Sequence, residues 1–99
     1  MMISKLSIIV ENPVTINLVP YNSSWPREFR REKKKLQRVL RDIVEKIEHI
    51  GSTAIPGIHA KPVIDILIGV KKLEDFDNKH IENIQSLGYQ YIKEYEREL

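Results

Sequence analysis

Residues 62–70 constrain the fold more than any other part of the chain, because Pro62 is followed by an almost unbroken apolar run. That run, Val-Ile-Asp-Ile-Leu-Ile-Gly-Val, is short and rich in β-branched residues, which predicts a central strand over residues 63–70, buried on both faces. Its charged residue is Asp65. A buried carboxylate is costly unless it is paired, hydrogen-bonded or bound to a metal. Asp65 therefore predicts a polar site where this strand meets solvent.

A glycine-containing turn precedes this strand. Gly51-Ser52-Thr53 follows residues 43–50, a segment that contains four β-branched residues and that we expect to form a strand. Such a turn exposes consecutive backbone N–H groups, and the hydroxyls of Ser52 and Thr53 add donors, so it could bind a phosphate. Its spacing is not that of a P-loop, because Ile58 stands where a lysine would follow Gly57. On local sequence alone, an ordinary turn stays open as the alternative.

Residues 49–70, taken as a unit, resemble the signature of the GrpB family, which lies within the nucleotidyltransferase superfamily and its polymerase-beta-like fold. The resemblance covers about residues 15–92 and includes Val19-Pro20-Tyr21, Trp25-Pro26, Phe29 and Leu87-Gly88-Tyr89. It implies an α+β fold and a nucleotide or phosphate-bearing ligand at the Gly-Ser-Thr turn. Some members of the family look like appendages of dephospho-coenzyme A kinase.

Two departures from the superfamily pattern bear on catalysis. Catalytic members place a second carboxylate two residues after the first, so that both bridge magnesium ions, whereas this chain has Leu67 there. The family pattern also continues past residue 99, so we expect residues 1–99 to form a single domain that is incomplete at its C-terminus. Whether the chain is an enzyme stays open. If it is active, we expect a metal-dependent nucleotidyltransferase with Asp65 as catalytic residue and Mg²⁺ ligand, although Mg²⁺ usually needs a second carboxylate or a substrate phosphate.

Lys61 and His49 complete the set of candidate ligand-binding residues. Lys61 lies between the turn and the strand of Asp65, where an ammonium group could neutralise a phosphate, or it could simply face solvent. His49 flanks the turn, and pairing of Asp65 with Lys61 or His49 would organise the turn without any chemistry. The spacing of His49, His59 and His80 matches no compact metal-binding motif.

The remaining elements follow from hydrophobic periodicity and from Gly and Pro positions. We expect strands at residues 14–19, 43–50, 63–70 and 89–92 and helices at residues 25–42 and 73–87. The charged tail, residues 93–99, is expected to fray. The order β-α-β-β-α-β predicts an α+β fold in which helices pack against a small mixed β-sheet, as in nucleotidyltransferases.

Composition excludes several classes of protein. The chain has no cysteine, so disulfides and a thiol nucleophile are excluded. Basic residues crowd positions 27–41 of the expected helix, which could face an anion or solvent, while the net charge is only +2. Residues 1–10 are too short to span a membrane and lack a cleavage site, so a cytoplasmic location is expected. No recognition-helix motif is present, so nucleic acid is not an expected partner.

The sequence supports two hypotheses of function from different classes. The first is a GrpB-like domain that binds a nucleotide or phosphate through Gly51, Ser52, Thr53, Lys61 and His49, with weak or no transferase activity. The second is a non-catalytic protein-interaction module, which would pair with a second copy or another protein through an open sheet edge. A truncated relic without an independent role is a third interpretation.

Overall fold

The expected buried strand is β3 (Val63–Val70), and it lies in the interior of a four-stranded sheet with the order β2-β3-β1-β4. The computed structural model describes residues 2–9 and 18–98. Along β3, Ile64, Ile66 and Ile68 are buried, while Asp65 and its neighbours on the same face are half-buried. The central position is therefore confirmed, but the burial is complete on one face only.

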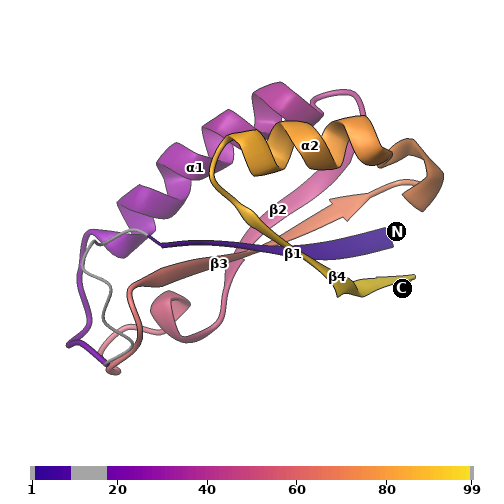
Figure 1. The fold of residues 1–99 in the computed structure, drawn as a ribbon. Helices are drawn as coiled ribbons and strands as arrows, with labels where there is room; N and C mark the ends of the chain where they lie inside the picture. The colour runs from indigo at the N-terminus through magenta and orange to yellow at the C-terminus, as the bar shows by residue number, and fades with distance from the viewer. Residues whose placement is uncertain (1, 10–17, 99) are drawn as a thin grey trace.

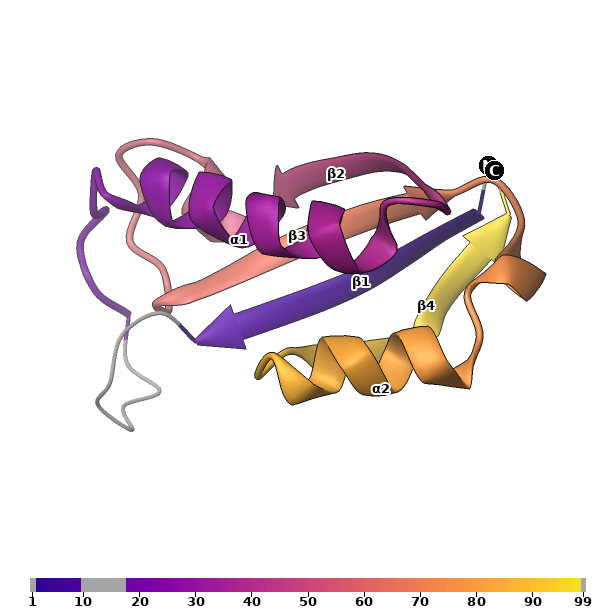
Figure 2. The ribbon, with the colours of Figure 1, turned by 90° about the horizontal axis from the view of Figure 1, so that it is seen from above.

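Both helices cover that buried face of the sheet (Figure 1). Seen from above, α1 (Trp25–Leu40) lies over β2 (Val44–Ile50) and β3, and α2 (Asn78–Ser86) lies on the side of β4 (Gln90–Glu98) (Figure 2). The core between the layers includes Trp25, Leu36, Leu40, Ile47, Ala60, Ile64, Ile66, Ile68, Val70, Phe76, Ile84 and Tyr89. Two layers around one apolar core are the simplest way to bury one face of a sheet.

Helix α1 forms where capping and periodicity predict it. The amide of Ser24 donates to Oδ1 of Asn22 over 2.8 Å, and Pro26 occupies the first turn, where its missing N–H costs nothing. The helix ends at Leu40, two residues before the expected end, because the chain turns there and the amide of Ile43 donates to the carbonyl of Leu40. Charged residues occupy most of its outer face.

The expected single helix over residues 73–87 is wrong in extent. A 3₁₀ turn, η2 (Leu73–Asp75), comes first, and α2 begins only after Asp77, whose carboxylate accepts from the amide of His80 over 3.1 Å. Aspartate is among the strongest N-caps, and its position sets the start of the helix. Gly88 ends the helix, with φ +97°, and Leu87 just before it is exposed.

The sheet differs from the expectation in three ways. Its described pairings are all antiparallel, so it is not mixed. Its first strand is β1 (Met2–Ile9), which the sequence pattern did not reveal, while the strand expected at residues 14–19 falls largely outside the described residues. Residues 93–98 of the tail expected to fray belong to β4, which pairs with β1. The element order β-α-β-β-α-β is observed, with β1 as its first strand.

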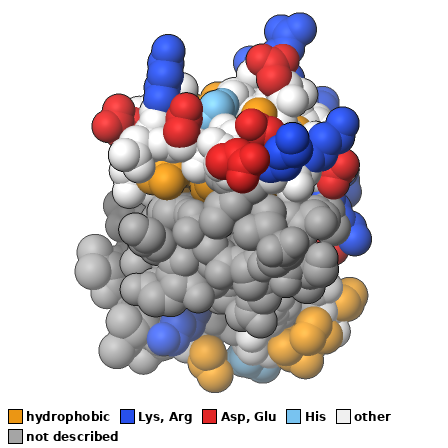
Figure 3. Space-filling view, turned by 90° about the vertical axis from the view of Figure 1, so that its right-hand side faces the viewer, with side chains coloured by type: hydrophobic (Ala, Val, Ile, Leu, Met, Phe, Trp, Pro, Cys, Tyr) orange, Lys and Arg blue, Asp and Glu red, His pale blue; other side chains and the backbone are white. Residues whose placement is uncertain are grey.

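The surface over the helices carries basic and acidic side chains side by side, and hydrophobic side chains gather at the opposite, lower margin of the view in Figure 3. Among the described residues, no helix is long and apolar enough to cross a bilayer.

Candidate functional site

The predicted site residues meet in one hollow at the end of β3 where Asp65 lies. The hollow has a volume of about 320 Å³. Its lining consists of Leu18, Ser52, Thr53, Ala60, Lys61, Val63 and Asp65. Four of the six residues predicted from sequence therefore share one cavity, and the other two, Gly51 and His49, are not among its lining residues.

Gly51 lies directly against the carboxylate of Asp65. A Cβ atom placed on Gly51 would come within 2.7 Å of Oδ2 of Asp65, closer than real contacts allow. The backbone of Gly51 also has φ +78° and ψ −169°, a conformation that is essentially restricted to glycine. This position therefore requires glycine for two independent reasons, and the close approach sets where the Asp65 carboxylate can lie.

The turn after Gly51 is a short 3₁₀ helix, η1 (Ser52–Ala54). Its internal hydrogen bonds run from the amide of Ala54 to the carbonyl of Gly51 and from the amide of Ile55 to the carbonyl of Ser52. Neither bond uses the amides of Ser52 or Thr53. Ser52 is exposed and lines the hollow, so its side chain is accessible to a ligand there.

Thr53 holds the turn in place. Its side chain is buried, and its hydroxyl donates to the carbonyl of Val63 over 2.9 Å. The same oxygen lies 2.9 Å from Nε2 of His49. Because the hydroxyl has one proton and gives it to Val63, Nε2 of His49 must carry the proton in the second bond. The expected role of Thr53 as a phosphate donor through its hydroxyl is not what this geometry offers.

His49 lies on the helix-covered side of the sheet. Its ring stacks on Phe29 of α1, with centroids 5.0 Å apart and planes 16° apart. Burial lowers the pKa of His49, and the nearby negative charge of Asp65 partly opposes that shift. The imidazole is therefore kept neutral near pH 7, in the state that donates to Thr53.

Lys61 is exposed at the rim of the hollow and supplies its cationic group. Two reciprocal backbone bonds between Val19 and Ala60, of 2.8 and 3.0 Å, bring the chain before α1 next to this loop. They place Leu18 in the lining, a contribution that no local sequence signal indicated. Ile55 and Ile58 in the same loop are exposed, as is Leu18.

The donors around Asp65 do not make a complete metal site by themselves. Within residues 2–9 and 18–98, no group of three or more His, Cys, Asp or Glu side chains is placed to hold a metal ion. In the hollow, one carboxylate stands with the hydroxyl of Ser52 and the ammonium of Lys61. Mg²⁺ takes six oxygen ligands and usually relies on more than one carboxylate or on substrate phosphates. Protein side chains alone therefore do not fit Mg²⁺ here.

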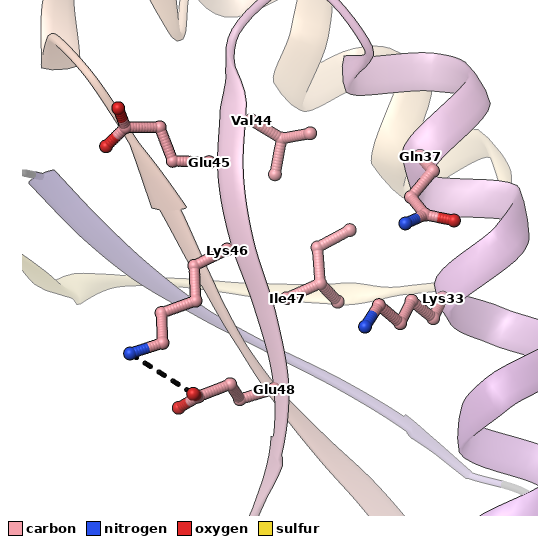
Figure 4. A pocket seen from close by; sticks show the side chains of 7 residues that line it. All are labelled: Lys33, Gln37, Val44, Glu45, Lys46, Ile47 and Glu48. Atoms are coloured by element: carbon pink, nitrogen blue, oxygen red, sulfur yellow. Dashed lines mark ion pairs between the residues drawn. The ribbon is translucent and has the colours of Figure 1, made fainter.

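A second, larger groove of about 390 Å³ lies between α1 and β2 (Figure 4). Val44 and Ile47 point from β2 toward α1, while Glu45 and Lys46 point away from it. Nζ of Lys46 lies 3.2 Å from Oε1 of Glu48, so this cation is already paired. The groove contains none of the predicted site residues, and the smaller hollow is the better candidate.

A family model described as GrpB protein matches residues 15–99. Among the relatives, the glutamate-rich protein GrpB of Alkalihalophilus pseudofirmus is 40% identical over 81 residues, which cover 82% of this chain and 47% of that protein. A UPF0157 protein of Halalkalibacterium halodurans is 39% identical over 75 residues, or 76% of this chain and 38% of that protein. This chain thus spans less than half the length of these relatives.

Some similar proteins carry a different name. A dephospho-CoA kinase of Mycolicibacterium paratuberculosis is 35% identical over 77 residues, which cover 75% of this chain but only 19% of that protein. No solved structure matches the fold of this chain.

Proposed function

Because the chain belongs to the GrpB family, we propose that it is a nucleotidyltransferase-type domain that binds a nucleotide or another phosphate-bearing small molecule in the hollow beside Asp65. The observation that carries this proposal is that Ser52 of the turn, Lys61 of the loop and Asp65 of β3 line one cavity. Its volume of about 320 Å³ falls at the lower end of ligand-binding pockets. A single convergent cation beside a hydroxyl suits one phosphate group.

The roles of the residues differ. Lys61 supplies positive charge to the phosphate, and Ser52 donates a hydrogen bond from its hydroxyl. Asp65, held by Gly51, accepts from the ligand or contacts it through water. His49 and Thr53 act indirectly, because their bonds to each other and to Val63 fix the turn.

We expect weak or no nucleotidyl transfer. Leu67 occupies the position at which a second carboxylate would help to hold the metal ions, and a hydrocarbon side chain cannot coordinate metal. A bound Mg²⁺ would thus depend on ligand phosphates for most of its shell. The relatives named dephospho-CoA kinase support a phosphate-bearing ligand, but the match covers too little of them to support the kinase reaction.

The ligand proposal is tested by titrating ¹⁵N-labelled protein with ATP, CTP and inorganic phosphate while amide shifts are followed. We expect shifts confined to residues 49–65. Ser52→Ala should weaken binding by about 1 kcal/mol, roughly fivefold. Lys61→Gln should weaken it more, whereas Lys72→Gln, which removes an exposed lysine outside the hollow, is the matched control.

A different pattern of shifts would contradict the site. Lys34, Arg38 and Arg41 line a separate hollow of about 340 Å³ on α1. Shifts confined to these residues, unchanged by Lys61→Gln, would mean that anions bind to the basic helix instead. Transfer of a labelled nucleotide that disappears in Asp65→Ala would overturn the expectation of weak or no activity.

The second candidate function, a protein-interaction module, is supported by the exposed side chains Leu18, Ile55 and Ile58 near the hollow. These residues are 62%, 51% and 40% exposed, and an apolar group on the surface is informative when several such residues lie together. A pull-down that captures a stoichiometric protein partner with the wild type, but not with Ile55→Ser/Ile58→Ser, would favour this function. Unchanged nucleotide binding by that double variant would separate the two functions.

A further inference from the structure

The position of β1 in the sheet is unexpected for a segment that lies outside the family match. The GrpB match begins at residue 15, whereas β1 comprises residues 2–9. Yet β1 is an interior strand, inserted between β3 and β4 in the order β2-β3-β1-β4. The family-matching part of the described sheet is thus divided in two, and β1 joins the parts.

The pairing of β1 with its neighbours is extensive. Eight consecutive positions pair with β3, from Met2 opposite Val70 to Ile9 opposite Val63. On the other side, five positions pair with β4, with a register shift between Ile3 and Lys5. Both rows of backbone groups of β1 therefore face a strand, as in peptides that add to a sheet by main-chain hydrogen bonds.

The register of β1 favours apolar residues at the positions of Leu6 and Ile8. Residues 2–9 contain no glycine or proline, and five of the eight are Met, Ile or Leu. The register places Leu6 opposite Ile66 and Ile8 opposite Ile64, and these two residues of β3 are fully buried beneath the helices. Because side chains alternate along a strand, a bound segment must be apolar at these two positions.

We propose that the gap between β3 and β4 is a strand-binding site, with residues 2–9 of the same chain as its resident occupant. The site takes an extended peptide of about eight residues, antiparallel to both neighbours and apolar at the positions of Leu6 and Ile8. Such a peptide binds in trans once the resident strand is displaced. This inference does not depend on the ligand proposed for the hollow.

The test uses the chain of residues 1–99 with Lys5→Pro/Leu6→Pro, which removes an N–H from each side of β1. A synthetic peptide of residues 1–10 is added to the ¹⁵N-labelled variant. We expect saturable shifts in residues 63–70 and 90–98. The matched control is the same peptide with Leu6→Asp/Ile8→Asp, which should bind about tenfold more weakly or not at all. Wild-type protein should also bind the peptide about tenfold more weakly, because its own strand occupies the site.

The result stays decisive if the double-proline variant does not fold. In that case the native peptide, but not the Asp-containing one, should restore the fluorescence of the buried Trp25. Absence of both shifts and refolding overturns the proposal. The proposal is also overturned if the amides of residues 2–9 in the wild type exchange hydrogen at the rate of a free peptide. A wild-type dimer that the peptide dissociates would show that the strand comes from a second copy, and would overturn the assignment to the same chain.

Discussion

The hydroxyl of Tyr89 donates a 2.5 Å hydrogen bond to Oε1 of Glu32, and so ties helix α1 to the residue before β4 across 57 positions of sequence. Both side chains are buried, and Oε2 of Glu32 lies 3.3 Å from Nζ of Lys35. Burial raises the pKa of Tyr89, and the hydrogen bond and negative charge of Glu32 raise it further. The phenol of Tyr89 therefore keeps its proton, and remains a hydrogen-bond donor, throughout the physiological pH range.

Tyr89→Phe should destabilise the fold by about 1–3 kcal/mol, because it leaves a buried carboxylate oxygen without its donor. Glu32→Leu/Tyr89→Phe should cost less than the sum of the single changes, since no unpaired polar group remains. Urea denaturation of the two single variants and the double variant measures this non-additivity. Strictly additive costs would show that the pair is not coupled.

Tyr89 also predicts a loss of stability at high pH. The pKa of a tyrosine in the unfolded chain is about 10, and that of Tyr89 in the folded protein is higher. The unfolded state therefore loses its proton first, and stability falls as pH rises above about 10. The difference in unfolding free energy between wild type and Tyr89→Phe should shrink from pH 9 to pH 11, roughly the range around that value. A constant difference would contradict the raised pKa.

His49 predicts a loss of stability in mild acid. Its folded-state pKa lies below the unfolded value of 6.5, so the unfolded chain binds the proton first as pH falls. Stability contributed by the neutral imidazole is complete above that value and is lost progressively below it. His49→Gln keeps a side-chain donor but does not titrate, so it should lose less stability on acidification from neutral pH. Denaturation curves of both proteins at several pH values test this, with His80→Gln as the control for an exposed histidine contact.

Gly51 and Gly57 form a matched pair for testing the contact with Asp65. Both have positive φ, +78° and +88°, but a Cβ on Gly57 would meet no atom within 4 Å. Gly57→Ala should therefore cost only backbone strain, about 1–2 kcal/mol. Gly51→Ala should cost about 1–3 kcal/mol more, because Asp65 must move. In an Asp65→Ala background the part of the cost of Gly51→Ala that comes from the contact should disappear and backbone strain should remain, so an unchanged cost in denaturation experiments would contradict the contact.

The hydroxyl of Thr53 should contribute to the stability of the fold separately from the shape of the side chain. Thr53→Val preserves the shape but leaves the carbonyl of Val63 and Nε2 of His49 without their partner, at a cost of about 1–3 kcal/mol. Thr53→Ser should cost less. The nitrogen shifts of His49 in labelled wild type should report the Nε2–H tautomer. A dominant Nδ1–H tautomer would show that the hydrogen bonds run in the other direction.

Local sequence was sufficient where local interactions decide the structure. The apolar run at residues 63–70 predicted β3 with its bounds, because no other element buries so short a β-branched segment. Helix α1 followed from hydrophobic periodicity, and the stop of α2 followed from Gly88. In the site, the sequence indicated the Gly-Ser-Thr turn because a glycine follows a β-branched segment. It indicated Asp65 because a carboxylate lies within an apolar run.

The extent of the helix within residues 73–87 was harder to predict from sequence, because two local signals competed. Apolar spacing suggested one helix, but the N-cap of Asp77 delayed its start and left a 3₁₀ turn before it. The expected mixed sheet is wrong for a different reason. An almost unbroken apolar run is typical of a parallel strand buried on both faces, but β3 pairs antiparallel with β1 and β2 and is fully buried on one face only.

The sequence by itself determined that a strand follows a glycine-containing turn in the region of the signature, and which residue types are available beside Asp65. Only the tertiary structure decided that Thr53 supports the turn from inside, that Leu18 joins the hollow, and that residues 2–9 divide the sheet between β3 and β4. The physical reason is that these features are contacts between distant segments. Their free energy depends on burial and hydrogen-bond geometry that exist only after the chain has folded.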